Sequence, residues 1–251
     1  MRKRLQLLFP FLLISICSFA QNERAGQGGN WGGGVDDQIF SPGFTFQYIS
    51  SEYKIYKKID WQNPYENPDL PGKFLKDSLM SISSKPSPGF GIGFVAGFRL
   101  GDNTDLRITP TLVFLDRLID YNYVTPAQYF QQRIPSTTVE FPVGIKLKSN
   151  RRLNFRSYIL AGGKYSMDIV SKKKTNDADK ILTEKFVKNQ KNMLSYEVAI
   201  GFDFYFEYFK LSPELKLSNS IKSVLRPEDH PYSRPLDKLF TRNFQFSLYF
   251  E

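Results

Sequence analysis

GFGIGFVAGFRL, residues 89–100, repeats with a period of two. One parity is entirely apolar and consists of Phe90, Ile92, Phe94, Ala96, Phe98 and Leu100. The other parity is mostly glycine and includes one charge, Arg99. A period of two predicts a β-strand. Because strands of transmembrane barrels alternate between residues that face lipid and residues that face a polar interior, this segment predicts a barrel wall with a crowded inner face.

Seven further segments alternate in the same way. They are 43–50, 105–115, 137–148, 153–167, 194–206, 210–221 and 240–250. The connections between them are alternately long (51–86, 118–135, 169–192, 222–239) and short (101–104, 149–152, 207–209). An even strand number, short periplasmic turns and long extracellular loops are typical of outer-membrane barrels. Prolines within three of these segments predict β-bulges at Pro110, Pro142 and Pro213.

The predicted fold is therefore all-β: an eight-stranded antiparallel up-and-down transmembrane β-barrel of the outer-membrane type, covering residues 43–251. The alternative is a soluble eight-stranded barrel of the lipocalin type. Such a barrel would bury the apolar parity and expose the polar one, whereas here Phe and Ile stand opposite the glycines. The mean hydropathy is −0.36, and no segment after residue 20 forms a continuous apolar helix. A protein of this composition in a membrane must be a barrel, because other forms leave backbone groups unsatisfied.

The N-terminus predicts export to the outer membrane. Arg2, Lys3 and Arg4 precede an apolar run over 5–19, and small residues stand before Gln21. This pattern predicts a cleaved signal peptide over 1–20, with a lipoprotein anchored at Cys17 as the alternative. Glycine-rich residues 21–42 then form a flexible periplasmic segment. Cleavage would leave a chain without cysteine, because Cys17 is the only one.

Charged residues of both signs fall on the parity expected to face the lumen. The candidate network consists of Arg99, Arg107, Glu140, Arg156, Glu197, Asp203 and Glu214, and Lys146, Lys164 and Lys216 share this parity. An eight-stranded barrel is only wide enough to be filled by side chains, and unpaired charges there are costly. We therefore expect a solid polar core, and a conducting or catalytic lumen is the alternative.

The longest loop, 51–86, carries prolines and aromatic residues. Its candidate partner-contact residues are Trp61, Tyr65, Leu70 and Phe74. Loops of this length are usually functional or disordered, so we expect either a contact surface for a partner or a self-packed cap over the barrel mouth. Loop 169–192 is rich in lysine, which suits anionic lipid headgroups or an acidic partner.

The residue inventory argues against an enzyme. His230 is the only histidine and stands in the last long loop, which predicts a solvated side chain and excludes a histidine-rich metal site. No nucleotide-binding or nucleic-acid-binding motif is present. We expect no cofactor, no metal and no nucleic-acid partner.

Four segments together resemble a known family. They are PGFGIGFVAGFRLGDNTDLRITPTLVFLDRLIDY (Pro88–Tyr121), TTVEFPVGIKLKS (Thr137–Ser149), NFRSYILAGGKYSMDIVSKK (Asn154–Lys173) and YEVAIGFDFYFEYFKLSPELKLS (Tyr196–Ser218). They are similar to the PorT family of Bacteroidetes outer-membrane proteins. The resemblance implies a barrel required for type IX secretion, which exports proteins with a conserved C-terminal domain and supports adhesin delivery in gliding relatives. The alternating end at Phe250 also resembles the signal read by the barrel-assembly machinery, although Glu251 stands where an aromatic residue is typical.

Two hypotheses of function follow. The first is a non-enzymatic component of type IX secretion that acts through loop or periplasmic contacts, with outer-membrane lipids, the assembly machinery and secretion components as partners. The second is a small structural or adhesion barrel that binds lipid or an external ligand without a role in secretion.

Overall fold

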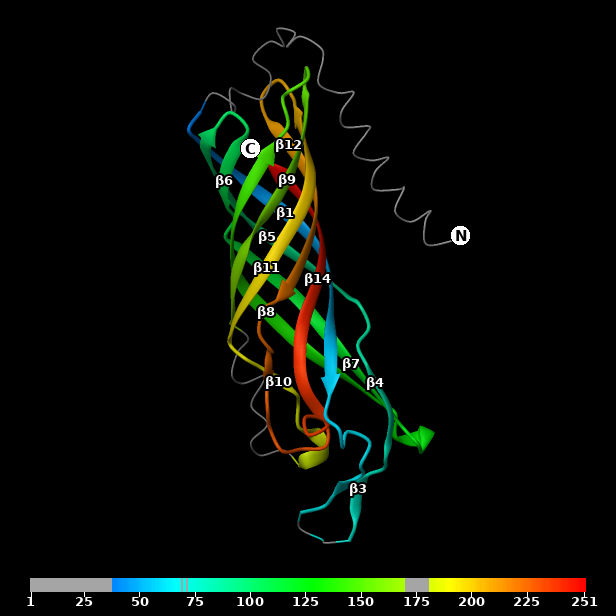
Figure 1. Cartoon of the computed structure of the whole chain (residues 1–251). Helices are drawn as coiled ribbons and strands as arrows, with labels where there is room; N and C mark the ends of the chain where they lie inside the picture. Colours follow the sequence, from blue (N-terminus) through cyan, green and yellow to red (C-terminus); the bar gives the residue numbers. More distant parts are fainter. Residues whose placement is uncertain (1–37, 69, 71, 170–180) are drawn as a thin grey trace, which may run out of the picture.

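Strands with alternating exposure close into one ring. The computed structural model describes residues 38–68, 70, 72–169 and 181–251; the predicted signal peptide and residues 21–37 lie outside them. The ring contains eight antiparallel strands when β6 and β7 are taken together. Its members are β1 (Phe40–Lys57), β5 (Ser87–Gly101), β6 (Thr104–Ile108), β7 (Thr111–Tyr123), β8 (Phe130–Lys148), β9 (Phe155–Asp168), β11 (Asn192–Tyr205), β12 (Lys210–Ser220) and β14 (Leu236–Phe250). Strand β1 pairs with both β14 and β5 and so closes the ring (Figure 1).

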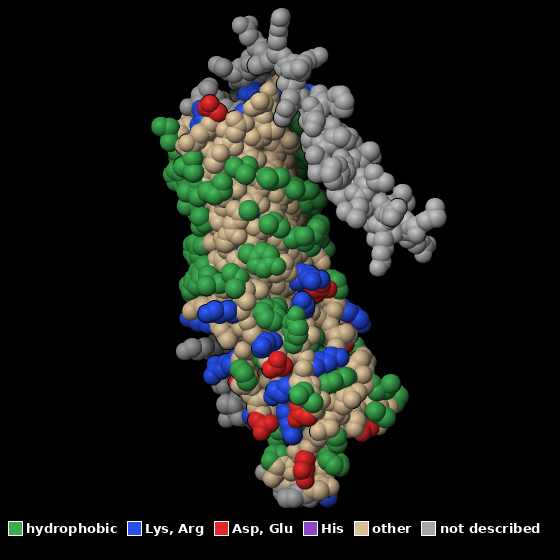
Figure 2. All heavy atoms as spheres, viewed as in Figure 1, with side chains coloured by type: hydrophobic (Ala, Val, Ile, Leu, Met, Phe, Trp, Pro, Cys, Tyr) green, Lys and Arg blue, Asp and Glu red, His purple; other side chains and the backbone are tan. Residues whose placement is uncertain are grey.

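The alternation in sequence produces two different faces. Residues of β11 are alternately exposed and buried along the whole strand, from exposed Asn192 to buried Tyr205. Large apolar side chains such as Phe94, Ile200 and Phe244 cover the outside of the barrel. Figure 2 shows these hydrophobic side chains around the barrel, with charged side chains gathered toward the end that carries the long loops. We call this end the loop end and the opposite one the turn end.

The loop end extends into a cap. Short elements lie between the long strands: β2 (Tyr65–Glu66), β3 (Phe74–Lys76), β4 (Leu79–Ser83), β10 (Lys188–Asn189), β13 (Leu225–Arg226) and the 3-10 helices η1 (Pro126–Gln128) and η2 (Leu182–Glu184). Strand β4 pairs with the outer end of β7, and β10 pairs with β13. No helix among the described residues is long and apolar enough to cross a membrane.

The strands are longer than predicted at the loop end. The predicted long loop 118–135 is wrong, because β7 and β8 remain paired as far as Tyr121 and Phe130 and leave only 124–129 unpaired between the two strands. The inward side chains beyond the barrel, such as Ile119 and Ile134, are apolar and buried. Because these side chains pack in the cap, β7 and β8 remain paired beyond the barrel. Strand β1 begins at Phe40, before the predicted boundary at 43, because Ser41 and Pro42 already pair with β5.

The expected bulges at the three prolines are also wrong. The register is unchanged on both sides of Pro142 and Pro213, and β5 pairs with β6 and β7 in one register across Pro110. The carbonyl groups of Pro110 and Pro142 still accept hydrogen bonds from Phe94 N–H (3.0 Å) and Thr109 N–H (3.1 Å). A proline removes one donor toward one neighbouring strand, and the rest of the ladder holds the register.

Candidate functional site

The barrel interior holds linked ion pairs that begin near the turn end. Arg107, on β6, pairs with Glu214 on the opposite wall (2.9 Å) and with Glu251 (3.5 Å). Lys210, the first residue of β12, pairs with the same Glu251 carboxylate (3.0 Å). Because β6 and β12 lie across the ring from each other, the Arg107–Glu214 pair crosses the lumen.

Glu214 connects this group to the middle of the barrel. Its carboxylate accepts hydrogen bonds from the hydroxyl groups of Tyr158 (2.8 Å) and Tyr249 (3.1 Å) and lies 3.3 Å from the amine of Lys216. The Tyr158 ring packs over Gly201, where an added Cβ would overlap the ring. Glycine at this position therefore makes room for the tyrosine that reaches Glu214.

The chain of ion pairs continues toward the loop end. Lys216 lies 3.5 Å from Glu197, and Lys164 bridges Glu197 (3.2 Å) and Glu140 (2.9 Å). Each of these side chains is at most 5% exposed. Each cation contacts a carboxylate, which offsets the cost of burying charge.

A separate pair lies beside this chain. The amine of Lys146 donates to both oxygens of Asp203 (2.7 and 2.8 Å), and the hydroxyl of Ser212 donates to Asp203 at 2.6 Å. Lys146 also lies 3.8 Å from the centre of the Tyr158 ring. The contacts above match five buried cations with five buried carboxylates: Arg107, Lys146, Lys164, Lys210 and Lys216 against Glu140, Glu197, Asp203, Glu214 and Glu251. The interior is thus packed with paired charges.

The structure separates the residues of the predicted network. Arg107, Glu140, Glu197, Asp203 and Glu214 lie in the interior and form the pairs above. Arg99 lies elsewhere, because it stands at the end of β5 and pairs with Asp102 in the β5–β6 turn (2.7 Å), where its side chain is 35% exposed. Parity places Arg99 on the inner face, but its position along the strand puts it at the rim. Arg156 is half-buried and stands next to Asp203 in the β9–β11 register.

Sequence reasoning missed two members of the interior. Lys210 opens β12, and Glu251 follows the last residue of β14. The signal for Glu251 was its parity, which it shares with the inward residues Ser247 and Tyr249. Glu251 departs from the aromatic residue that the assembly signal favours, and its side chain instead turns into the barrel.

A further buried cation marks the junction between barrel and cap. Arg117 Nε donates to the hydroxyl of Ser51 (3.0 Å), which in turn donates to Asn243 Oδ1 (2.7 Å). The guanidinium lies 5.6 Å from the centre of the Tyr53 ring. From Arg117 toward the loop end, buried apolar side chains such as Ile119, Tyr121 and Ile134 take the place of the ion pairs.

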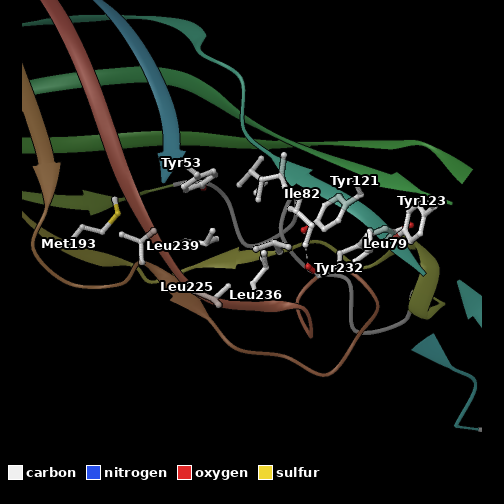
Figure 3. Packing of buried hydrophobic residues seen from close by; sticks show 14 residues of the cluster. Tyr53, Leu79, Ile82, Tyr121, Tyr123, Met193, Leu225, Tyr232, Leu236 and Leu239 are labelled. Atoms are coloured by element: carbon white, nitrogen blue, oxygen red, sulfur yellow. Dashed lines mark hydrogen bonds between the residues drawn. The ribbon is translucent and has the colours of Figure 1, made fainter. Parts of the chain in front are cut away.

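The cap has its own hydrophobic core. It unites fourteen buried residues from the loops and the strand extensions (Figure 3). Tyr232 is central, because its carbonyl accepts a hydrogen bond from the Tyr121 hydroxyl (2.7 Å) and its ring stacks on Phe130 at 4.5 Å. Burial raises the pKa of the Tyr121 hydroxyl well above its ordinary value, so this group remains a donor.

His230 contradicts its predicted role as a solvated loop residue. It is completely buried, and its Nδ1 accepts a hydrogen bond from the backbone N–H of Tyr232 (3.4 Å). Its carbonyl accepts from Ser233 N–H (3.1 Å) and Arg234 N–H (3.0 Å). The histidine thus fixes the turn that carries Tyr232 into the cap core.

The candidate contact residues of loop 51–86 divide into two pairs. Trp61 packs on the cap core, with the amine of Lys57 4.0 Å from its ring centre, and Tyr65 is only 7% exposed. Tyr65 is therefore part of the cap and is not accessible to a partner. Leu70, between β2 and β3, is 50% exposed, and Phe74, the first residue of β3, is 63% exposed. They alone of the four present a large apolar surface.

Comparison with known proteins gives one family and several solved structures. A family profile described as outer membrane protein beta-barrel domain matches residues 19–226. Among solved structures, OprG from Pseudomonas aeruginosa is 11% identical, with 84% of this chain and 93% of that chain covered and a TM-score of 0.42. Ail of Yersinia pestis, in complex with the heparin analogue sucrose octasulfate, is 10% identical, with 85% and 99% covered and a TM-score of 0.35. Neisserial surface protein A is 8% identical, with 84% and 98% covered and a TM-score of 0.37. No curated protein matches this chain in sequence.

Proposed function

This chain belongs to the outer membrane protein beta-barrel domain family, and we propose that it is a non-enzymatic component required for type IX protein secretion. In this proposal the turn end is periplasmic and the loop end extracellular. The protein acts through contacts of its loops or of its periplasmic segment, and its partners are outer-membrane lipids, the barrel-assembly machinery and other secretion components.

The packed interior is the observation that favours action through the outer surface. Side chains from opposite walls meet across the lumen, as Arg107 and Glu214 do, and the cap core closes over the loop end. An eight-stranded barrel has little interior space beyond its side chains. A protein built in this way is suited to act through its outer surface.

The same observation supports a non-enzymatic role. Glu140 and Glu197, two of the inward carboxylates, are both paired with Lys164. A carboxylate that is buried and paired with a lysine serves the packing of the barrel. No group of three or more metal-ligating residues is found among the described residues.

The type IX assignment itself rests on the resemblance of 88–121, 137–149, 154–173 and 196–218 to the PorT family. The exposed residues Leu70 and Phe74 supply a candidate contact surface at the loop end. Contiguous exposed apolar surface is typical of protein contact sites, and both side chains are available for such a contact. A structural or adhesion barrel with no role in secretion would use the same surface for an external ligand, and is our second candidate.

Gene deletion separates the two candidates. We expect deletion to abolish release of cargo that carries the C-terminal domain, and the intact gene to restore it. The variant Leu70→Ser/Phe74→Ser should insert normally and restore secretion poorly. The control Ile181→Ser, which changes another exposed apolar loop residue, should restore it fully. Normal cargo release from the deletion strain would reject the secretion role and leave the structural or adhesion role.

A further inference from the structure

Three rungs of the β1–β14 ladder stand just beyond the apolar belt at the loop end. In register they pair Glu52 with Arg242, Lys54 with Phe240, and Tyr56 with Lys238. These residues alternate with buried neighbours such as Tyr53 and Leu239, so they share the outer face. We call Lys54, Lys238 and Arg242 the β1–β14 basic patch.

The three cations of the patch are neighbours on one surface. Lys54 is diagonal to both Arg242 and Lys238, and diagonal partners on one sheet face lie about 7–8 Å apart. Glu52 is the only acid in the three rungs and lies 3.6 Å from Arg242. Within the described part of the chain, neither Lys54 nor Lys238 forms an ion pair with a carboxylate. The patch therefore keeps a net positive charge.

Aromatic and apolar side chains surround the cations of the patch. Tyr56 and Phe240 stand between the cations, with their rings edge to face at 5.6 Å, and the amine of Lys54 lies 5.2 Å from the centre of the Tyr56 ring. Toward the turn end, the same ladder presents Phe244 and Phe246, which are 45% and 40% exposed. Along the barrel axis the surface changes from apolar side chains at Phe246 and Phe244 to rungs in which cations and aromatic rings are interleaved. This change matches the profile of a lipid from acyl chain to headgroup.

Two cations on other strands at the loop end are paired within the protein. Arg133, on β8 across the ring from β14, pairs with Asp116 (3.1 Å), and Lys85, just before β5, pairs with Asp120 (3.1 Å). These cations are already neutralised by residues of the protein. Lys54 and Lys238 differ from these two cations in having no carboxylate partner among the described residues. Figure 2 shows Lys and Arg side chains at the border of the hydrophobic surface.

We propose that the β1–β14 basic patch binds the phosphate group of an anionic lipid whose acyl chains lie along Phe244 and Phe246. Arg242 supplies planar guanidinium donors that suit phosphate oxygens, and Lys54 and Lys238 add point charges from either side. This site goes beyond the proposed role in secretion and does not depend on it. In the proposed orientation the lipid belongs to the outer leaflet.

The test uses the whole mature protein, freed of lipid in detergent, with native mass spectrometry to compare binding of phosphatidic acid and phosphatidylcholine. The wild type should prefer phosphatidic acid. Each basic residue beside an anionic headgroup adds about fivefold to affinity, so Lys54→Ser/Lys238→Ser should weaken phosphatidic acid binding about 25-fold. The control Arg133→Ser removes an exposed cation on β8, across the ring from β14, and should leave binding nearly unchanged. Heat-modifiable migration on a gel shows that each variant is folded.

Two further measurements on the wild type test the lipid site even if a variant fails to fold. Raising the salt concentration should weaken phosphatidic acid binding to the wild type, because exposed charges are screened. Millimolar inorganic phosphate should compete poorly, since it lacks acyl chains. Equal affinity for both lipids, an equal loss in the control variant, or complete displacement by inorganic phosphate would each overturn the lipid site.

Discussion

The side chains of Lys210 and Glu251 form an ion pair at 3.0 Å inside the barrel, and their backbones are also joined by two hydrogen bonds. Lys210 N–H donates to the carbonyl of Glu251 (2.6 Å), and Glu251 N–H donates to the carbonyl of Lys210 (3.0 Å). The Glu251 carboxylate also reaches Arg107. One residue therefore joins β14 to β12 through its backbone and to β6 through its side chain.

Glu251→Gln should destabilise the barrel. It leaves Arg107 and Lys210 buried with less compensating charge, and breaking a buried pair by removing one partner costs about 3–5 kcal/mol. We expect the temperature of the heat-modifiable shift on a gel to fall. Replacing the exposed Asp102, whose pairing with Arg99 is at the surface, should leave that temperature nearly unchanged. If Glu251→Gln is as stable as the wild type, the carboxylate has no structural role.

Gly201→Ala should be destabilising, because its Cβ would overlap the Tyr158 ring that reaches Glu214. Overpacking of this kind typically costs about 1–3 kcal/mol. Gly163→Ala is a matched control on the neighbouring strand, since its Cβ would meet only Ser195 O at 3.8 Å. Urea unfolding in lipid vesicles measures both variants. Equal midpoints for the two would show that Tyr158 does not need the space above Gly201.

The cap should loosen in acid through Asp120. Burial favours the neutral form of this carboxyl, but hydrogen bonds from Gln131, Lys85 and Tyr129 outweigh it, so its pKa lies below the ordinary value. A lowered pKa in the folded state stabilises the cap above about pH 4, the ordinary pKa of Asp, and this contribution is lost as the pH falls through the folded-state value.

Fluorescence of Trp61, which packs on the cap core, can follow this transition in a Trp31→Phe background. The emission of the parent protein should change as the pH is lowered from 7 to 3. In Asp120→Asn this acid-dependent change should be smaller, because the titrating group is gone. The same pH profile in both proteins would exclude Asp120 as its cause.

The cap and the barrel should lose structure separately. Leu239 is completely buried in the cap core, and Leu→Ala substitutions at such sites cost about 2–5 kcal/mol. Leu239→Ala should therefore make the loops sensitive to protease while heat-modifiable migration is retained. Phe74→Ala, at an exposed position of the cap, should show no added sensitivity. Loss of the folded band in Leu239→Ala would mean that the cap supports the whole barrel.

The sequence predicted the barrel well because lipid and lumen impose opposite requirements on alternate residues. The period of two in 89–100 and 194–206 indicated both the strands and their inner faces. The parity of a residue indicates its face but not its position along the barrel axis, so the sequence does not distinguish Arg99 at the rim from Arg107 in the interior. The fold assignment is confirmed, whereas the partners of each charge came only from the structure.

The cap was harder to predict for a physical reason. Beyond the barrel the strands leave the boundary between lipid and lumen, and buried residues such as Ile119, Tyr121 and Leu239 come from several distant segments. No local period marks such a core. The burial of His230 is also not predictable from the sequence, because a loop position predicts exposure unless the loop itself folds.

The central claim is that the barrel acts through its outer surface because its interior is filled. Conductance of the purified protein in planar lipid bilayers at neutral pH tests this claim most directly. The account predicts no reproducible conductance steps, because paired side chains occupy the lumen and the cap core covers the loop end. Stable steps of uniform size from the folded protein would contradict it and show that the lumen is a conduit.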